Sequence, residues 1–102
     1  MKPIVIHPQA QEEFEAGCAF YEDRRFGLGR ELRIAVEEAV RQVQKYPGLG
    51  GWYKSSGFRH VIVRRFRYVI YYAELTDVIW VAAIAHGSRR PDYWRRRRLG
   101  QP

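Results

Sequence analysis

The residues best suited to chemistry lie together near the C-terminal end of the chain. Residues 86–98 hold one histidine, six arginines, one tyrosine and one tryptophan. A histidine ionises near neutral pH and a guanidinium binds phosphate through two donors, so this combination suits cleavage of a phosphodiester or binding of an anionic partner. An arginine run alone is typical of a solvated basic tail. The histidine and the aromatic residues among the arginines favour a functional segment.

Metal-free cleavage of RNA needs a proton acceptor, a proton donor and cations at the phosphate. His86 can accept or donate the proton, and Tyr93 can donate a proton or stack on a base. Arg59 and Arg89 can hold the phosphate. Two structural alternatives stay open, because Arg59 can equally belong to the polar face of a strand and His86 can cap a strand end.

Other kinds of catalytic site find little support. The histidines are far apart in the sequence and no CxxC or HxxxH spacing occurs, so we predict no metal site and no cofactor. The glycines of residues 48–51 lack the Lys and Ser/Thr of a phosphate-binding loop. Cys18, the single cysteine, excludes an internal disulfide and falls on an apolar helix stripe, which predicts a packed core thiol.

The charge of the chain is unevenly distributed. The chain has 102 residues and a net charge of +7, and residues 51–102 carry eleven Lys+Arg against three Asp+Glu. This length predicts one domain spanning residues 1–102, with residues 95–102 as a basic tail. The positive half favours nucleic acid or an acidic protein segment as partner. No apolar run is long enough to span a membrane and no signal peptide is evident, so we expect a cytoplasmic protein without a membrane role.

Two amphipathic helices are predicted in the first half. A short strand over residues 3–7 precedes a helix over about residues 9–24. A glycine turn at Gly27-Leu28-Gly29 then leads into a second helix over about residues 28–46. Both helices carry one apolar stripe, which predicts a helical hairpin that covers another layer.

The second half predicts three consecutive strands over residues 58–64, 66–74 and 78–86, with residues 52–57 as a loop. The short connections require an antiparallel meander, and the apolar run of the last strand favours a central, buried position. Residues 92–99 are predicted as a short helix or a basic tail. The predicted fold class is therefore α+β, with an N-terminal strand and a helical hairpin packed on a small, mainly antiparallel sheet.

Strand direction limits which of these residues can meet. The first and third meander strands run the same way, so Arg59 at the start of one and His86 at the end of the other lie at opposite ends of the sheet unless the chain folds back. Arg65 and Arg67 enter the middle strand at the end where His86 lies. We expect Trp94 to pack back onto the sheet.

In the order of its elements and in several motifs, the chain resembles the RelE/ParE superfamily of type II toxin–antitoxin toxins, and more closely its ParE-like, plasmid-stabilisation branch. The most specific matches are Arg65-Phe66-Arg67-Tyr68-Val69-Ile70-Tyr71-Tyr72 and Ile84-Ala85-His86-Gly87-Ser88-Arg89-Arg90-Pro91-Asp92-Tyr93-Trp94. Weaker ones are Ala10, Glu12-Glu13-Phe14, Phe20-Tyr21, Gly27-Leu28-Gly29, Tyr46-Pro47 and Gly57-Phe58-Arg59.

The resemblance implies a growth-inhibiting toxin that a cognate antitoxin neutralises with an acidic or amphipathic segment, within a toxin–antitoxin hetero-oligomer. RelE-like members cleave messenger RNA on the ribosome, whereas ParE-like members poison DNA gyrase. Two departures count against the nuclease role and favour gyrase. Arg67 stands where many family members have a proline before the tyrosine, and the lysine-rich sheet surface typical of RelE-like nucleases is missing, because Lys2, Lys45 and Lys54 are the only lysines.

We therefore predict a gyrase-directed toxin. The alternatives are a ribosome-dependent, metal-free endoribonuclease that uses His86, Arg89, Tyr93 and Arg59, and a non-toxic basic module that binds nucleic acid. The residues predicted to contact target or antitoxin are Arg59, Arg65, Arg67, Arg89, Arg90, Tyr93 and Trp94.

Overall fold

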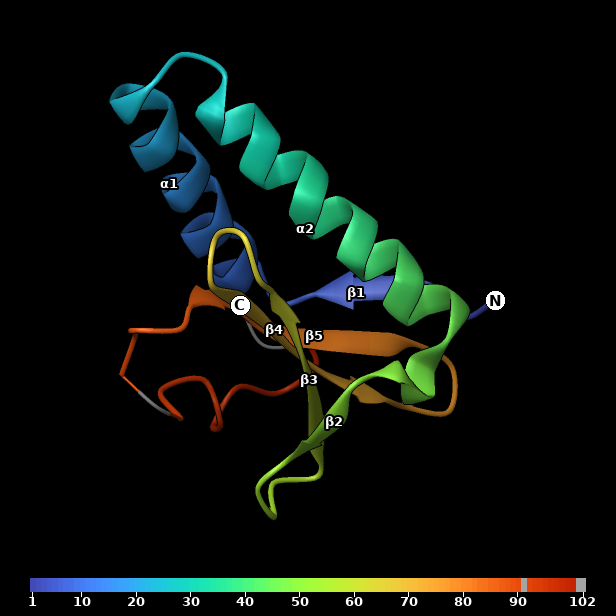
Figure 1. Ribbon diagram of the computed structural model, residues 1–102. Coiled ribbons are helices and arrows are strands. Elements are labelled where there is room, and N and C mark those ends of the chain that lie inside the picture. The colour runs from blue at the N-terminus through green and yellow to red at the C-terminus, as the bar shows by residue number, and fades with distance from the viewer. Residues whose placement is uncertain (91, 101–102) are drawn as a thin grey trace.

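The computed structural model describes residues 1–90 and 92–100 (Figure 1). Pro91 and residues 101–102, the end of the predicted basic tail, lie outside the described residues. The elements follow the order β1, α1, α2, a single 3-10 turn over Pro47–Leu49, and then β2 to β5. The predicted α+β class is confirmed, with two helices on one face of a five-stranded sheet.

The helical hairpin closely follows its sequence pattern. Helix α1 spans Pro8–Arg24 and helix α2 spans Leu28–Lys45. Gly27 turns the chain between them with a φ of 86°, a left-handed conformation that glycine adopts without strain. A Cβ on Gly29 would lie 2.2 Å from the carbonyl oxygen of Cys18, so glycine lets the two helices approach closely. Cys18 is buried in the core, as predicted.

The sheet has the order β1-β5-β4-β3-β2. Strands β3 (Phe58–Val63), β4 (Tyr68–Glu74) and β5 (Ile79–His86) form the predicted antiparallel meander. Strand β1 (Ile4–Ile6) pairs with β5 in parallel, so β5 is central and nearly all of it is buried, as predicted. The prediction of a loop at residues 52–57 was partly wrong, because β2 (Gly51–Tyr53) pairs with Phe58–His60 as an edge strand.

The turn between β3 and β4 is longer than predicted. Phe66 and Arg67 were assigned to the middle strand, but β4 begins at Tyr68. The amide of Arg67 donates to the carbonyl of Arg64, and Arg67 has a φ of 57°, a turn conformation outside the range of strands. Phe66 nevertheless remains buried, with its ring 5.5 Å from that of Tyr21 in α1.

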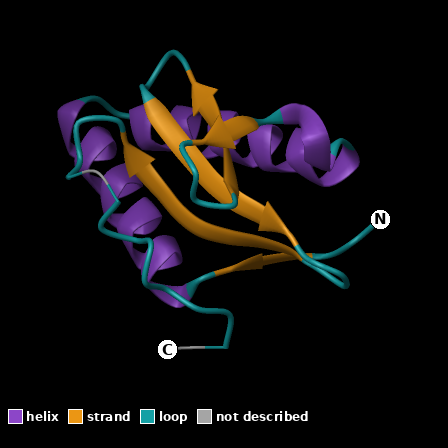
Figure 2. Cartoon of the chain, turned by 90° about the horizontal axis from the view of Figure 1, so that it is seen from below, coloured by secondary structure: helices purple, strands orange, loops and turns teal. Residues whose placement is uncertain are grey.

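The two faces of the sheet are covered differently. On the helix face, side chains of both helices pack on the sheet around Phe14, Leu32, Val36, Ile70 and Ile84. On the opposite face, a second and largely aromatic cluster surrounds Trp80 and Trp94. Figure 2 views the sheet with the helices behind it, and the C-terminal loop runs along the side of β5.

The C-terminal segment, residues 92–100, covers this second cluster without forming a helix. The predicted helix over residues 92–99 is wrong for the described residues, which adopt turns and irregular backbone from a left-handed Asp92 onward. Trp94 packs back onto the sheet, as predicted: it is 1% exposed and its ring stacks on Tyr71 at 4.5 Å. Ring contacts with Tyr53 and Phe58 complete this attachment.

Candidate functional site

Glu13, on α1, joins the helical hairpin to the C-terminal part of the chain. Its carboxylate accepts hydrogen bonds from the Tyr93 hydroxyl at 3.1 Å and from Arg97 Nη2 at 2.9 Å. Arg89 Nη2 lies 3.8 Å from the same carboxylate. We call Glu13, Arg89, Tyr93 and Arg97 the Glu13 cluster; its partners span the end of β5 and the C-terminal segment.

Arg97 is the most deeply placed member of this cluster. We expected Arg95 to Arg98 to be solvated as part of a basic tail, and for Arg97 this was wrong because its side chain is only 9% exposed. Its Nη1 donates to the carbonyl of Ala82 at 2.8 Å. Ala82 is skipped in the β4–β5 register, a β-bulge that leaves its backbone without a strand partner. Arg97 thus compensates for a local defect in the sheet.

The ring of Tyr93 contacts two guanidinium groups. The guanidinium carbon of Arg89 lies 4.4 Å from the centre of the Tyr93 ring, and that of Arg97 lies 5.1 Å from it. Burial, followed by the negative charge and the hydrogen bond of Glu13, raises the pKa of Tyr93 to about 12. At neutral pH the hydroxyl therefore stays protonated and donates to Glu13, which makes it a poor proton donor for a reaction.

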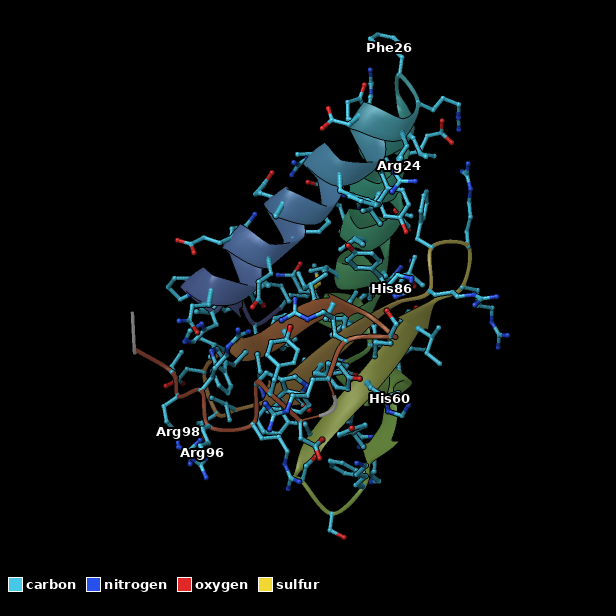
Figure 3. All side chains as sticks on the ribbon, turned by 90° about the vertical axis from the view of Figure 1, so that its left-hand side faces the viewer. Arg24, Phe26, His60, His86, Arg96 and Arg98 are labelled. Atoms are coloured by element: carbon cyan, nitrogen blue, oxygen red, sulfur yellow. The ribbon has the colours of Figure 1, made fainter. Side chains whose placement is uncertain are left out.

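His86 ends β5 and is partly exposed (Figure 3). Its Nδ1 lies 2.7 Å from the Ser88 hydroxyl and accepts from the Ser88 amide at 3.1 Å. The ring stands edge-on to that of Tyr68, at 5.8 Å. The amide of Arg89 donates to the His86 carbonyl, so the two residues share one tight turn. This geometry is that of a capped strand end whose other ring nitrogen has no hydrogen bond within the described residues.

Arg59 lies apart from this group. It faces Tyr72 in the β3–β4 register, whereas His86 faces Tyr68, four residues away along β4, or about 13 Å. Arg59 Nη1 donates to the Gly50 carbonyl at 2.8 Å, and its guanidinium lies 3.9 Å from the centre of the Trp52 ring. The structure therefore brings Arg89 and Tyr93 together, with His86 beside them, and leaves Arg59 at the other end of the strands.

Arg65 and Arg67, two more of the predicted contact residues, lie near the His86 end of the sheet. Arg65 forms an ion pair with Glu31 of α2, and the carbonyl of Arg67 accepts from the amide of Gly87 at 2.7 Å. Arg90 is exposed, whereas Trp94 is buried and acts by anchoring the C-terminal segment.

Sequence reasoning missed two central residues of this site, Glu13 and Arg97. Glu13 was noted as part of a helical motif without a role, and Arg97 looked like any other member of the run from Arg95 to Arg98. A weak signal existed for Glu13: it lies one residue before the buried Phe14, so it is placed at the border of the stripe that packs on the sheet.

The described residues contain no group of three His, Cys, Asp or Glu side chains placed to hold a metal ion. Among them, no helix combines the length and hydropathy that a membrane crossing requires.

Comparison with known proteins gives one finding. The family model for the ParE toxin of the type II toxin–antitoxin system parDE matches residues 4–91, from β1 through the turn after β5. A comparison with curated proteins finds no match. The matched region contains both helices, the sheet and three of the four nuclease candidates, which are Arg59, His86 and Arg89. Because the match covers most of the chain, this protein belongs to the ParE toxin family of type II toxin–antitoxin systems.

Proposed function

We propose that this toxin inhibits growth by acting on DNA gyrase in the cytoplasm, and that it does so as a binding protein without cleaving RNA. Membership in the ParE family supports the gyrase target. The observation that carries the non-nucleolytic mode is the Glu13 cluster, in which the polar groups of the C-terminal part of the chain are engaged with one another.

The arrangement of the nuclease candidates supports this reading. The Tyr93 hydroxyl is bound to Glu13, and its pKa of about 12 is far from the working range of a general acid. Arg89 stacks on Tyr93, and Arg59 is bound to the Gly50 carbonyl at the other end of the strands. A catalytic group of four needs these side chains around one phosphate, which this geometry does not supply.

The antitoxin of the parDE system is the expected neutralising partner. We propose that its acidic or amphipathic segment contacts exposed arginines of the toxin, within a hetero-oligomer. Guanidinium groups at the rim of an interface bind carboxylates and speed association. The residues proposed for this role, or for contact with the target, are the partly exposed Arg59 and the exposed Arg65, Arg67, Arg89 and Arg90. Tyr93 and Trp94 hold the C-terminal segment, residues 92–100, in place.

Induction of the toxin alone and together with its antitoxin tests the proposal. We expect growth to stop only when the toxin is made alone. Under that condition plasmid DNA should lose negative supercoiling while messenger RNA stays intact. Unimpaired growth would contradict toxicity, and rapid cleavage of transcripts that His86→Ala abolishes would replace the gyrase mode with the nuclease mode.

A further inference from the structure

One border of the molecule is rich in arginine and extends well beyond the residues considered so far. It begins at the far end of the helical hairpin, passes over the β3–β4 turn and ends in the turn after β5. Figure 3 places Arg24 and Phe26 at the far end of the hairpin, with His86 below them. We call this border the arginine edge; its members are Arg24, Arg25, Arg30, Arg64, Arg65, Arg67, Arg89 and Arg90.

Direct contacts make the arginine edge continuous. Glu31, in the first turn of α2, pairs with Arg25 of the hairpin turn at 3.2 Å and also with Arg65 of the β3–β4 turn. The β3–β4 turn is in turn bound to the end of β5 through the hydrogen bond from the Gly87 amide to the Arg67 carbonyl. The hairpin turn, the β3–β4 turn and the turn after β5 are therefore connected to one another by these contacts.

The positive charge of the edge is only partly neutralised. Glu31 is shared between two arginines, and Glu13 lies 3.8 Å from Arg89. The carboxylate of Glu22 accepts from the amides of Gly27 and Gly29. Asp23 is the remaining acid at the hairpin end. Within the described residues, the exposed side chains of Arg30, Arg64 and Arg67 have no ion pair or hydrogen bond.

An aromatic side chain projects from the end of this edge. Phe26, in the hairpin turn, is 92% exposed. Phe20 nearby is 52% exposed, and the guanidinium of Arg24 lies 4.4 Å from the centre of its ring. An almost fully exposed phenylalanine at the tip of a protruding hairpin contributes nothing to the fold, so a role in binding accounts for it better than packing does.

We propose that the arginine edge binds duplex DNA, with its guanidinium groups on the phosphates and Phe26 as an apolar wedge at the end of the contact. Duplex DNA presents closely spaced phosphates along a rod, which suits cations arrayed along a border. Proteins that bind the minor groove insert such apolar side chains between base steps. An acidic protein segment, such as the one proposed for the antitoxin, would also match the charge, but a larger protein interface has an apolar centre. Phe20 and Phe26 are exposed at the hairpin end of the edge, whereas Phe66, in the β3–β4 turn at its middle, is buried.

This inference deepens the proposed function, since a toxin that acts on a DNA-bound enzyme gains affinity from a second contact on the DNA. The DNA-binding proposal can be tested without gyrase. Binding to DNA is measured on the toxin alone and inhibition of supercoiling is measured with the enzyme, so either result can fail without the other.

The first experiment measures anisotropy of a fluorescein-labelled duplex of mixed sequence, titrated with toxin at several salt concentrations. The variant carries Arg30→Gln, Arg64→Gln and Arg67→Gln. Its matched control removes the same charge elsewhere, with Arg41→Gln, Lys45→Gln and Lys54→Gln, all exposed. We expect the edge variant to bind about tenfold or more weakly at low salt, with a salt slope smaller by about 2 to 3. The control should lose much less.

A second pair of variants tests the edge by strengthening it. Glu31→Gln removes the acid that neutralises Arg25 and Arg65, so DNA affinity should rise about two- to fourfold. Glu38→Gln, on the same helix and paired with Arg41, removes the same charge away from the edge and should have a smaller effect. Phe26→Ala should weaken binding about fivefold without changing the salt slope, because its contact is apolar.

Every variant must have the circular dichroism spectrum and melting curve of the parent, so that a change in binding cannot come from a change in fold. Equal affinities for the edge variant and its control would overturn the proposal, as would absence of binding by the parent chain. If labelled polyglutamate binds as tightly as the duplex and Phe26→Ala has no effect on the duplex, the edge serves an acidic protein and the DNA proposal is wrong.

Discussion

The two faces of the sheet are stabilised in opposite ways. On the helix face, two helices of 17 and 18 residues bury many aliphatic side chains, and Leu32, Val36 and Val43 are each at most 1% exposed. On the other face, a segment without regular structure is attached through the ring of Trp94 and through a few hydrogen bonds of Asp92, Tyr93 and Arg97. The first face distributes its stability over many contacts, whereas the second concentrates it in a few.

The contrast between the two faces indicates which part of the molecule can serve function. A face held by many packed residues tolerates little movement, while a segment attached at a few points can be released or shifted at modest cost. The Glu13 cluster lies where the two regions join, so it controls the attachment of the C-terminal segment to the rigid part of the molecule. The following changes separate the two faces, in order of expected effect.

Trp94→Ala should destabilise the second face most. Loss of a buried tryptophan costs about 3–5 kcal/mol, and Trp94 is 1% exposed against three aromatic neighbours. Urea unfolding followed by tryptophan fluorescence measures the loss. The matched control, Trp52→Ala, removes a tryptophan that is 63% exposed and should cost less than about 1 kcal/mol. Equal losses would mean that the C-terminal segment is not held by Trp94.

Leu32→Ala tests the helix face in the same way. Leu32, in α2, is fully buried, and truncation of such a side chain costs about 2–5 kcal/mol. Because the surrounding contacts are many, we expect cooperative unfolding of the entire chain at lower urea rather than release of one segment. Ile34→Ala, two residues away and 52% exposed, provides the control and should change stability little. If Leu32→Ala instead loosened only one part of the chain, the two faces would not differ in the way proposed.

Glu13→Gln should loosen the second face without unfolding the first. It removes the charge opposite Arg97, whose side chain is 9% exposed, and leaving that guanidinium unpaired costs about 1–3 kcal/mol. Hydrogen exchange should rise in residues 92–100 and stay unchanged in α2. Glu12→Gln changes the exposed neighbour and should leave exchange as in the parent. If residues 92–100 exchange as slowly in both variants as in the parent, Glu13 does not attach the segment.

His7 provides a smaller, pH-dependent effect at the base of α1. Its Nδ1 accepts from the amide of Gln9 as an N-terminal cap, and burial, followed by the charge of Arg97, lowers its pKa. Since the folded state then resists protonation, stability is present above the unfolded pKa of about 6.5 and is lost as pH falls below it. His7→Asn retains a capping side chain without titrating, so it should lose less stability than the parent between pH 7 and 5 in urea unfolding. A parent-like loss in this variant would exclude His7 as the cause.

The sequence predicted the helix face better than the second face, for a physical reason. Apolar residues at helical spacing fix both the helices and the side they bury, so the hairpin and the core position of Cys18 followed from periodicity. Strand β2 has only three residues and is defined by its partner β3, so no local pattern reveals it. Residues 92–100 depend on long-range contacts in the same way.

The candidate site was predictable in part. The separation of Arg59 from His86 followed from strand direction alone, and the anchoring of Trp94 followed from its size. The role of Arg97 did not, because four consecutive arginines are equivalent until a turn decides which one faces the bulge at Ala82. Glu13 lies 84 residues from Arg97, a pairing that only the folded chain defines.

An assay of DNA supercoiling by purified gyrase, with this toxin added, decides whether the toxin acts on gyrase. We predict that the wild-type toxin and His86→Ala inhibit supercoiling equally, that the antitoxin relieves both, and that neither cleaves messenger RNA on ribosomes. The opposite result would be undiminished supercoiling and cleavage of transcripts by the wild type but not by His86→Ala. It would contradict the proposal that the C-terminal polar residues serve attachment and recognition.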